Sequence, residues 1–208
     1  FLDEAPEFRA GVLDGLRQPM ESGEVVIARA QAVARFPASF QLVMAANPCP
    51  CGQGDSADEL CGCPAAARRR YLARLSGPLL DRVDLRLTVA RPSRADLVAV
   101  GTAECSQAVA ERVALARDRA ATRLAGTPWR VNADLPGREL RGRFAPQPGS
   151  TAPAERAMSR GRLSARGLAR VLRVAWTIAD LHGSPRPGLA EVDLALKLRA
   201  DGHLGAMV

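Results

Sequence analysis

A nearly continuous apolar run, Phe40-Gln41-Leu42-Val43-Met44-Ala45-Ala46, most constrains the fold of this 208-residue chain. Runs that lack polar alternation are typical of parallel strands that are buried on both faces. Proline cannot donate to a sheet ladder, so Asn47-Pro48 ends the strand and leaves the Asn47 side chain at its tip. The run therefore predicts an α/β domain with a parallel sheet.

A second short apolar stretch, Phe1-Leu2, leads directly into two adjacent carboxylates, Asp3 and Glu4. At the end of a buried strand, an Asp can hold Mg²⁺ through water and the next Glu can polarise an attacking water. Two acidic residues at a strand end are more often a solvated turn. The pair alone therefore does not assign a nucleotide site.

Hydrophobic periodicity predicts the other elements. Helical spacing of apolar residues predicts helices over about 6–18, 65–75, 98–124, 138–144, 165–181 and 189–199. β-Branched residues predict a β-hairpin at 24–36, and period-two alternation predicts a strand at 83–90. The sequence thus predicts the second half of an α/β domain in residues 1–92 and an all-α domain in residues 93–208.

The formal net charge is +7, and nearly all of the positive charge comes from arginine. A GC-rich genome that favours arginine codons would explain this, and so would a polyanionic partner such as nucleic acid. No run of about 18 apolar residues and no signal peptide is visible. We therefore expect a cytoplasmic protein without a membrane partner.

Cysteines cluster in the loop at residues 48–63, as two C-x-C pairs made of Cys49, Cys51, Cys61 and Cys63. Four thiolates can close a tetrahedral Zn²⁺ site with no open position, which makes such a site structural. C-x-C is tighter than the usual C-x₂₋₄-C spacing, so free thiols or a redox pair remain alternatives. The pattern predicts a structural Zn²⁺ site, whereas Cys105 is expected to be a small buried residue.

Several strings of the sequence resemble the magnesium-chelatase-like AAA+ ATPases of the YifB and ComM type. They are Phe1–Glu4, Leu16–Glu21, Ala45–Gly52, Leu75–Leu85 and Leu163–Leu181. The resemblance implies a AAA+ P-loop NTPase core, whose second half, a parallel sheet with an inserted pre-sensor-1 β-hairpin, lies in residues 1–92. It also implies that residues 93–208 form the helical lid of that family.

The resemblance implies a role for individual residues of these strings. Asp3 would hold Mg²⁺, and Glu4 would orient the water that attacks ATP. Asn47 would be sensor 1, the amide that reads the γ-phosphate. Arg82 would be the arginine finger that acts on ATP in the adjacent subunit, and Arg166 would be the sensor 2 arginine of the lid.

Two of these roles have simpler alternatives that the spacing leaves open. Arg82 is flanked by aspartates and could be part of a salt-bridged strand start. Arg166 shares a helix face with Arg170 and Arg173, so the three could form a solvated basic face.

The predicted hairpin at 24–36 lies between the acidic pair and Asn47, where ring helicases and magnesium chelatases carry a pre-sensor-1 hairpin. The resemblance implies that Arg29 is a DNA contact in a ring pore, and Arg35 adds a second cation. One cation supplies phosphate contact rather than sequence readout. The alternative is an exposed hairpin with ordinary surface arginines.

No G-x-x-x-x-G-K-[ST] phosphate-binding loop occurs in the sequence. We therefore expect the chain to be a fragment that lacks an N-terminal part, and that alone neither binds ATP tightly nor hydrolyses it. In the full-length protein, the resemblance implies an ATP- and Mg²⁺-dependent ring, with a hexamer expected. Its activity would be helicase or branch migration on DNA during competence and recombination.

The sequence is also compatible with two other functions. A chelatase-type AAA+ subunit would use the same ATPase to remodel a protein partner during metal insertion into a tetrapyrrole. A non-catalytic, zinc-clipped DNA-binding module would suit the basic charge. It would, however, leave Asp3, Glu4, Asn47 and Arg82 unexplained.

Overall fold

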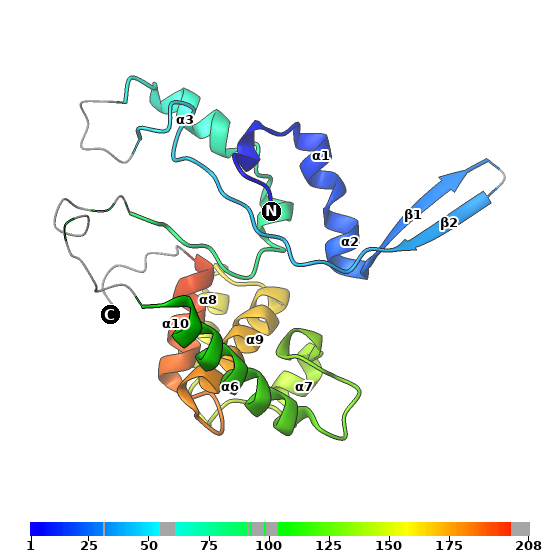
Figure 1. Cartoon of the computed structure of the whole chain (residues 1–208), viewed down its shortest axis with the longest axis vertical. Helices are drawn as coiled ribbons and strands as arrows, with labels where there is room; N and C mark the ends of the chain where they lie inside the picture. The colour runs from blue at the N-terminus through cyan, green and yellow to red at the C-terminus, as the bar shows by residue number, and fades with distance from the viewer. Residues whose placement is uncertain (31, 55–60, 91, 93–97, 99–103, 201–208) are drawn as a thin grey trace. The chain divides into compact units, whose positions relative to one another are not determined.

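The computed structural model describes residues 1–30, 32–54, 61–90, 92, 98 and 104–200 (Figure 1). The chain forms two compact units, Phe1–Val83 and Asp84–Val208. Unit 1 combines short helices with one two-stranded sheet, and unit 2 is built from helices. Among the helices described, none is long and apolar enough to span a bilayer.

Unit 1 begins with three short helical segments, η1 (Ala5–Glu7), α1 (Ala10–Gly15) and α2 (Arg17–Ser22). The single helix predicted over 6–18 is therefore wrong. The backbone is extended at Phe8, which ends η1. In a continuous helix, Pro19 could not donate to the carbonyl four residues earlier and its ring would clash there, so the chain turns between α1 and α2.

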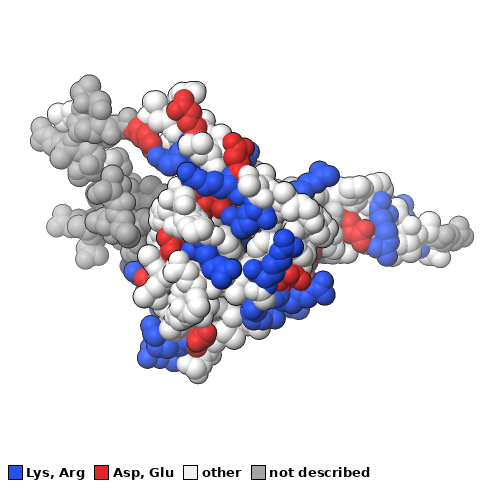
Figure 2. Space-filling model, turned by 90° about the horizontal axis from the view of Figure 1, so that it is seen from below, with Lys and Arg blue, Asp and Glu red and all other residues white. Residues whose placement is uncertain are grey.

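The predicted β-hairpin is confirmed, with β1 (Glu24–Arg29) antiparallel to β2 (Ala32–Pro37). The ribbon extends away from the rest of unit 1 (Figure 1), and α2 contacts its first strand. Figure 2 shows basic and acidic side chains side by side on this projecting ribbon. The hairpin leaves Ile27, Val33 and Phe36 exposed, at 47%, 64% and 52%.

The apolar run at 40–46 pairs at only one point, a parallel bridge between Met44 and Leu2. Three backbone hydrogen bonds hold this pairing, Leu2 N–H to Val43 O at 2.9 Å, Ala45 N–H to Leu2 O at 2.9 Å and Ala5 N–H to Ala45 O at 2.8 Å. The prediction that the run is buried on both faces is wrong among the described residues, because none of its seven residues is fully buried. Its Phe40 and Val43 side chains remain about half exposed.

Two further helices complete unit 1, α3 (Ala65–Leu72) within the predicted range 65–75 and α4 (Gly77–Leu80). Ser76 caps the N-terminus of α4 by accepting from a backbone N–H, and its hydroxyl donates to Asp14 Oδ1 at 2.7 Å. The bond joins α4 to α1, the two helices that also bury Leu79 and Leu13.

The strand predicted at 83–90 is not found among the described strands. Within this segment the structure gives a single β-bridge residue, Thr88, and the Arg86 N–H donates to Leu198 O, at the end of α10, at 2.8 Å, so no continuous ladder is described. The alternating apolar residues of this segment, Leu85, Leu87 and Val89, are exposed. The period-two pattern is therefore real, but it does not correspond to a buried face.

Unit 2 contains the helical segments α6 (Ser106–Leu124), η2 (Asn132–Asp134), α7 (Gly137–Arg141), α8 (Ala152–Ser159), α9 (Ala165–His182) and α10 (Leu189–Ala200). The helices predicted over 165–181 and 189–199 are confirmed, whereas α8 was not predicted. The buried face of α6 lies at Ala116, Ala120 and Leu124. The apolar residues of its first half, Val109 and Val113, are each 37% exposed.

The core of unit 2 is organised around α9, which contributes more buried side chains to it than any other described helix. Ser164 caps the helix by accepting from the Gly167 N–H at 3.0 Å, and Gly183 ends it with a left-handed φ of 73°. The Trp176 indole N–H donates to the Phe144 carbonyl at 2.9 Å, which satisfies its polar edge inside the core.

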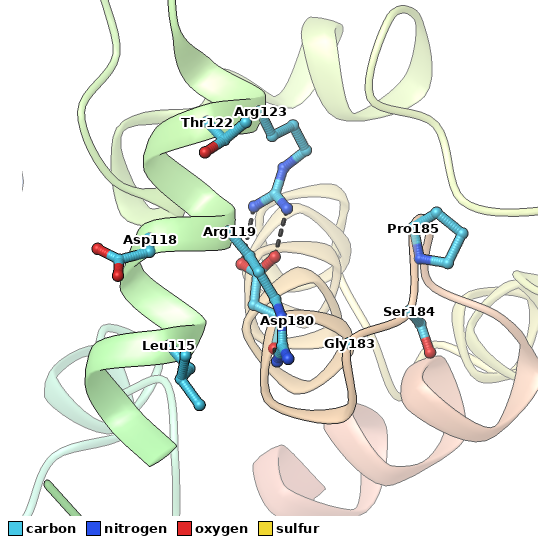
Figure 3. Close-up of a pocket in the computed structure, with 9 residues that line it drawn as sticks. All are labelled: Leu115, Asp118, Arg119, Thr122, Arg123, Asp180, Gly183, Ser184 and Pro185. Carbon is cyan, nitrogen blue, oxygen red and sulfur yellow. Dashed lines mark hydrogen bonds and ion pairs between the residues drawn. The ribbon is translucent and has the colours of Figure 1, made fainter. Parts of the chain in front are cut away.

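One buried ion pair joins α6 to α9 (Figure 3). Asp180, only 2% exposed, accepts two hydrogen bonds from the Arg123 guanidinium, which lies 4.0 Å from the ring centre of Trp176. Asn132 Nδ2 donates to the same carboxylate at 2.9 Å, and Arg119 Nη1 donates to the Asp180 carbonyl at 2.6 Å. Arg119, Arg123 and Asp180, which hold the two helices together, also line an adjoining hollow of about 460 Å³.

We predict that Asp180→Ala lowers the free energy of unfolding by about 3 kcal/mol, because it leaves the Arg123 guanidinium partly buried without its counter-charge. Asp193→Ala is the matched control, since its partner Lys197 is 69% exposed and such surface pairs contribute less than about 1 kcal/mol. Urea denaturation followed by circular dichroism measures both. Equal losses for the two variants would contradict this assignment.

Candidate nucleotide site and metal cluster

The acidic pair and Asn47 follow two segments that run parallel. Asp3 and Glu4 come directly after Leu2, and Asn47 comes shortly after Met44, the residue that pairs with Leu2. The carboxyl ends of parallel strands meet at one edge, so the three polar residues emerge on the same side. All three are exposed, as a site that receives a soluble ligand requires.

Glu4 has a backbone conformation that few side chains adopt. Its φ of 48° makes it the non-glycine residue with positive φ among those described. The Glu4 N–H donates to Asp3 Oδ1 at 2.9 Å, which stabilises the turn. A left-handed residue outside glycine costs about 1 kcal/mol or more and often marks a functional site. The strain sets the direction in which the Glu4 carboxylate leaves the strand end.

Tyr71, on α3, is a neighbour of this edge that the sequence did not reveal. It is 4% exposed. Burial raises the pKa of its hydroxyl, the carboxylates of Glu7 and Glu4 raise it further, and a backbone hydrogen bond with Asn47 lowers it. One phenol thus lies close to both halves of the site. No local pattern could have found it, because α3 reaches the site only through the fold.

Arg82, predicted as an arginine finger, lies at the end of α4 and is held within unit 1. Its guanidinium donates to Glu21 at 2.6 Å and to the Pro78 carbonyl at 2.7 Å, and its side chain is 13% exposed. The carboxylate of α2 is therefore a partner that the sequence spacing did not indicate. Arg82 borders a shallow hollow with Asp14 and Gln18.

Arg166 lies in the first turn of α9, in unit 2, and is exposed. Its two neighbours on the helix are engaged, because Arg170 binds Asp84 at 2.7 Å and Arg173 donates to the Leu135 carbonyl at 2.9 Å. Burial lowers the pKa of Arg173. The three arginines therefore do not form one solvated basic face.

The two arginines of the hairpin do not lie together. Cross-strand pairing places Arg29 opposite Ala32, next to the turn, and Arg35 opposite Val26, nearer the base. Side chains alternate between faces along a strand, so this register puts the two cations on opposite faces of the ribbon. Arg35 also forms an ion pair with Glu24 at 2.6 Å.

The four clustered cysteines converge as predicted. Their sulfur atoms all lie within 4.8 Å of one another. The Cys49 sulfur is 3.3 Å from that of Cys51 and 3.6 Å from that of Cys61, and Cys51 and Cys61 are 3.7 Å apart. Tetrahedral Zn²⁺ with bonds of about 2.3 Å needs sulfur atoms about 3.8 Å apart, so the donor set fits this ion.

Cys49 is buried, and it is the thiol whose acidity changes most. Burial opposes its ionisation, but hydrogen bonds with Cys51 and Cys61 outweigh this and lower the pKa to about 6. A thiolate at neutral pH suits a metal ligand. Cys105 is exposed at the start of α6, so the prediction that it is buried is wrong.

Comparison with known families covers nearly all of the chain. The family model described as magnesium chelatase, subunit ChlI, matches residues 1–97, and the model of the ChlI C-terminal region matches residues 103–199. The chain belongs to the magnesium-chelatase-like family. The predicted resemblance is confirmed, and membership implies a AAA+ fold.

Curated relatives extend over most of this magnesium-chelatase-like chain. Identity is 49% over 202 residues with an uncharacterized protein of Mycobacterium tuberculosis, covering 97% of the chain and 40% of the relative. Identity is 42% over 195 residues with competence protein ComM of Haemophilus influenzae, an alignment that covers 92% of this chain and 37% of the relative. Identity is 40% over 185 residues with uncharacterized protein YifB of Escherichia coli, an alignment that covers 88% of this chain and 35% of the relative. The chain therefore spans about two fifths of the length of these relatives.

Tyr71 is the only tyrosine of the chain, so absorbance near 295 nm reports its ionisation alone. We predict a native titration above the ordinary pKa of about 10. Glu4→Gln should move it towards that value, because removing a negative charge makes the phenolate less unfavourable. Glu139→Gln, on α7 of unit 2, is the matched control and should leave it unchanged. A native titration that coincides with that of the urea-unfolded chain would contradict the predicted location of Tyr71.

Proposed function

We propose that this chain is part of a AAA+ ATPase that works as a ring and acts on DNA. One observation carries the proposal: the parallel pairing of Leu2 with Met44 brings an Asp-Glu pair and an amide to one strand edge. Hydrolysis of a nucleoside triphosphate needs a carboxylate for the metal, a second carboxylate for the water and a polar group near the γ-phosphate. The family membership supports the same reading.

Each residue at this edge has a distinct chemical task in the proposal. Asp3 holds Mg²⁺, which supplies charge neutralisation of the phosphates when it is bound with ATP. Glu4 accepts the proton of the attacking water and orients it. Asn47 offers a donor and an acceptor that do not titrate. The strained backbone of Glu4 fixes the position of the base relative to the other two.

The arginines extend the site to other subunits in the proposed ring, for which six copies are the expected number. Arg82 acts on ATP in a neighbouring subunit, where a planar guanidinium matches the charge of the transferring phosphoryl group. To do so it exchanges Glu21 and the Pro78 carbonyl for phosphate oxygens. Arg166 serves as sensor 2, which is supported by its exposure and by the engagement of Arg170 and Arg173 elsewhere.

DNA is the proposed substrate of the cytoplasmic motor, in helicase or branch-migration reactions of competence and recombination. The name of the relative ComM, a competence protein, supports this assignment. So do the net charge of +7 and the projecting hairpin, on which Arg29 and Arg35 are the proposed phosphate contacts.

A chelatase-type subunit is the second candidate, because both matching family models are described by a magnesium chelatase subunit. In that reading the same ATPase remodels a protein partner during metal insertion into a tetrapyrrole. DNA-stimulated hydrolysis discriminates the two, since only the DNA motor is expected to accelerate when DNA is added.

The cysteine cluster is proposed to hold one structural Zn²⁺ through Cys49, Cys51, Cys61 and Cys63. The sulfur separations fit a tetrahedral ion, and four protein ligands leave no position for a reacting water. The ion would fix the loop that follows Asn47 rather than take part in hydrolysis.

In the full-length protein, Glu4→Gln should reduce ATP turnover by about 10²- to 10⁴-fold and leave nucleotide affinity nearly unchanged, because the amide keeps the shape but cannot accept the proton. Glu7→Gln is the matched control, since this carboxylate is three positions away in an exposed pair with Arg74. Phosphate release and fluorescent-nucleotide binding measure the two effects. Full activity of Glu4→Gln would refute the assigned role.

The purified chain is expected to contain about one Zn²⁺, and Cys61→Ser should lower the content well below that value, because a closed site loses one of four ligands. Cys105→Ser, at an exposed cysteine outside the cluster, should retain the metal. Elemental analysis by mass spectrometry measures both. A metal-free wild-type chain purified under reducing conditions without chelator would count against the zinc site.

A further inference from the structure

One face of the hairpin combines an aromatic ring with a cation. Residues directly opposite each other in an antiparallel pair lie on the same face of the sheet. The register therefore gives one face to Val25, Ile27, Arg29, Ala32, Ala34 and Phe36. Phe36 lies level with Val25 near the base, and Arg29 lies level with Ala32 next to the turn.

This face is open in the part of the chain that the structure describes. Phe36 is 52% exposed, Ile27 is 47% exposed, and Arg29 is exposed. Arg29 forms no ion pair with another described residue, whereas Arg35, on the opposite face, is neutralised by Glu24. The face with the aromatic ring is thus also the face with the uncompensated positive charge.

Small side chains on this face of the ribbon leave room for a ligand between Arg29 and Phe36. Ala32 and Ala34 keep the β2 side of the face low, so a ligand can lie along the ribbon from Arg29 to Phe36. The two positions stand four residues apart along the strand, about 13 Å. A single nucleic-acid strand covers that distance with a few nucleotides.

We propose that this face binds single-stranded DNA, with Arg29 on a phosphate and the Phe36 ring stacked on an unpaired base. The inference rests on the proposed DNA-motor function and names a base-contacting residue for it. Aromatic stacking is sequence-tolerant because every base has a π-face, and it selects against duplex because paired bases are already stacked. Phe36 therefore makes the ribbon specific for single strands without reading sequence.

Charge decides between DNA and a second copy of the chain as the occupant. Apolar contact with another copy would use Ile27 and Phe36 but would leave Arg29 without a counter-charge. A polyanion satisfies the cation and the aromatic ring together.

The test measures binding by the full-length protein of two fluorescent oligonucleotides of about 16 residues, oligothymidylate and a strand of the same length without bases. Wild type should prefer the base-containing strand by about tenfold. Phe36→Leu should remove this preference and keep the salt dependence, and Phe36→Tyr should retain both. Arg29→Gln should weaken both strands equally and reduce the salt slope by about one.

The outcomes separate this inference from the proposed function. If wild type binds DNA but does not distinguish the two strands, only the stacking role of Phe36 is overturned. The same holds if Phe36→Leu weakens both strands equally and changes the sedimentation of the protein, because the face is then an interface between copies. If wild type binds neither strand at any salt concentration, both the proposed DNA-motor function and this inference are refuted.

Discussion

The parallel pairing of Leu2 with Met44 is the constraint on which the candidate site depends. Its backbone hydrogen bonds join two segments about forty residues apart. Only this pairing brings the polar residues that follow the two segments to one edge. Asp3 and Glu4 without this pairing would be an acidic turn, and Asn47 would be a polar residue before a proline. The pairing turns them into one edge, against which the buried Tyr71 packs.

The two units are stabilised in different ways. Unit 2 has a contiguous apolar core around α9, reinforced by the buried Arg123–Asp180 pair. Unit 1 buries few large apolar side chains, among them Leu13 and Leu79, and its short helices are joined by polar contacts such as Ser76 to Asp14. Such contacts break at lower cost than a packed core. The elements that carry Asp3, Glu4, Asn47 and Arg82 are thus better able to shift than the helices of unit 2.

Sequence reasoning succeeded where the determinants are local and failed where they are not. The hairpin, helix α9 and the cysteine cluster were predicted because turn residues, helical spacing and close ligands lie within one short segment. The strand predicted at 83–90 was wrong because alternation describes only side chains, whereas a strand also requires a continuous ladder, and the described backbone of this segment has a single bridge at Thr88. The ion pair between Glu21 and Arg82 was not predicted, because no sequence pattern indicates that two residues so far apart in the chain contact each other.

The cysteine cluster and the strand edge are mechanically linked. Asn47 precedes Cys49, which is buried, by only two residues. The loop folds back closely, since a Cβ at Gly54 would lie 3.1 Å from the Cys49 sulfur and one at Gly52 would lie 3.9 Å from the Asn47 amide. A side chain at Gly54 would thus force the sulfur or the loop to move. Because two residues of backbone cannot absorb a large displacement, a movement of Cys49 would also displace the backbone at the strand edge.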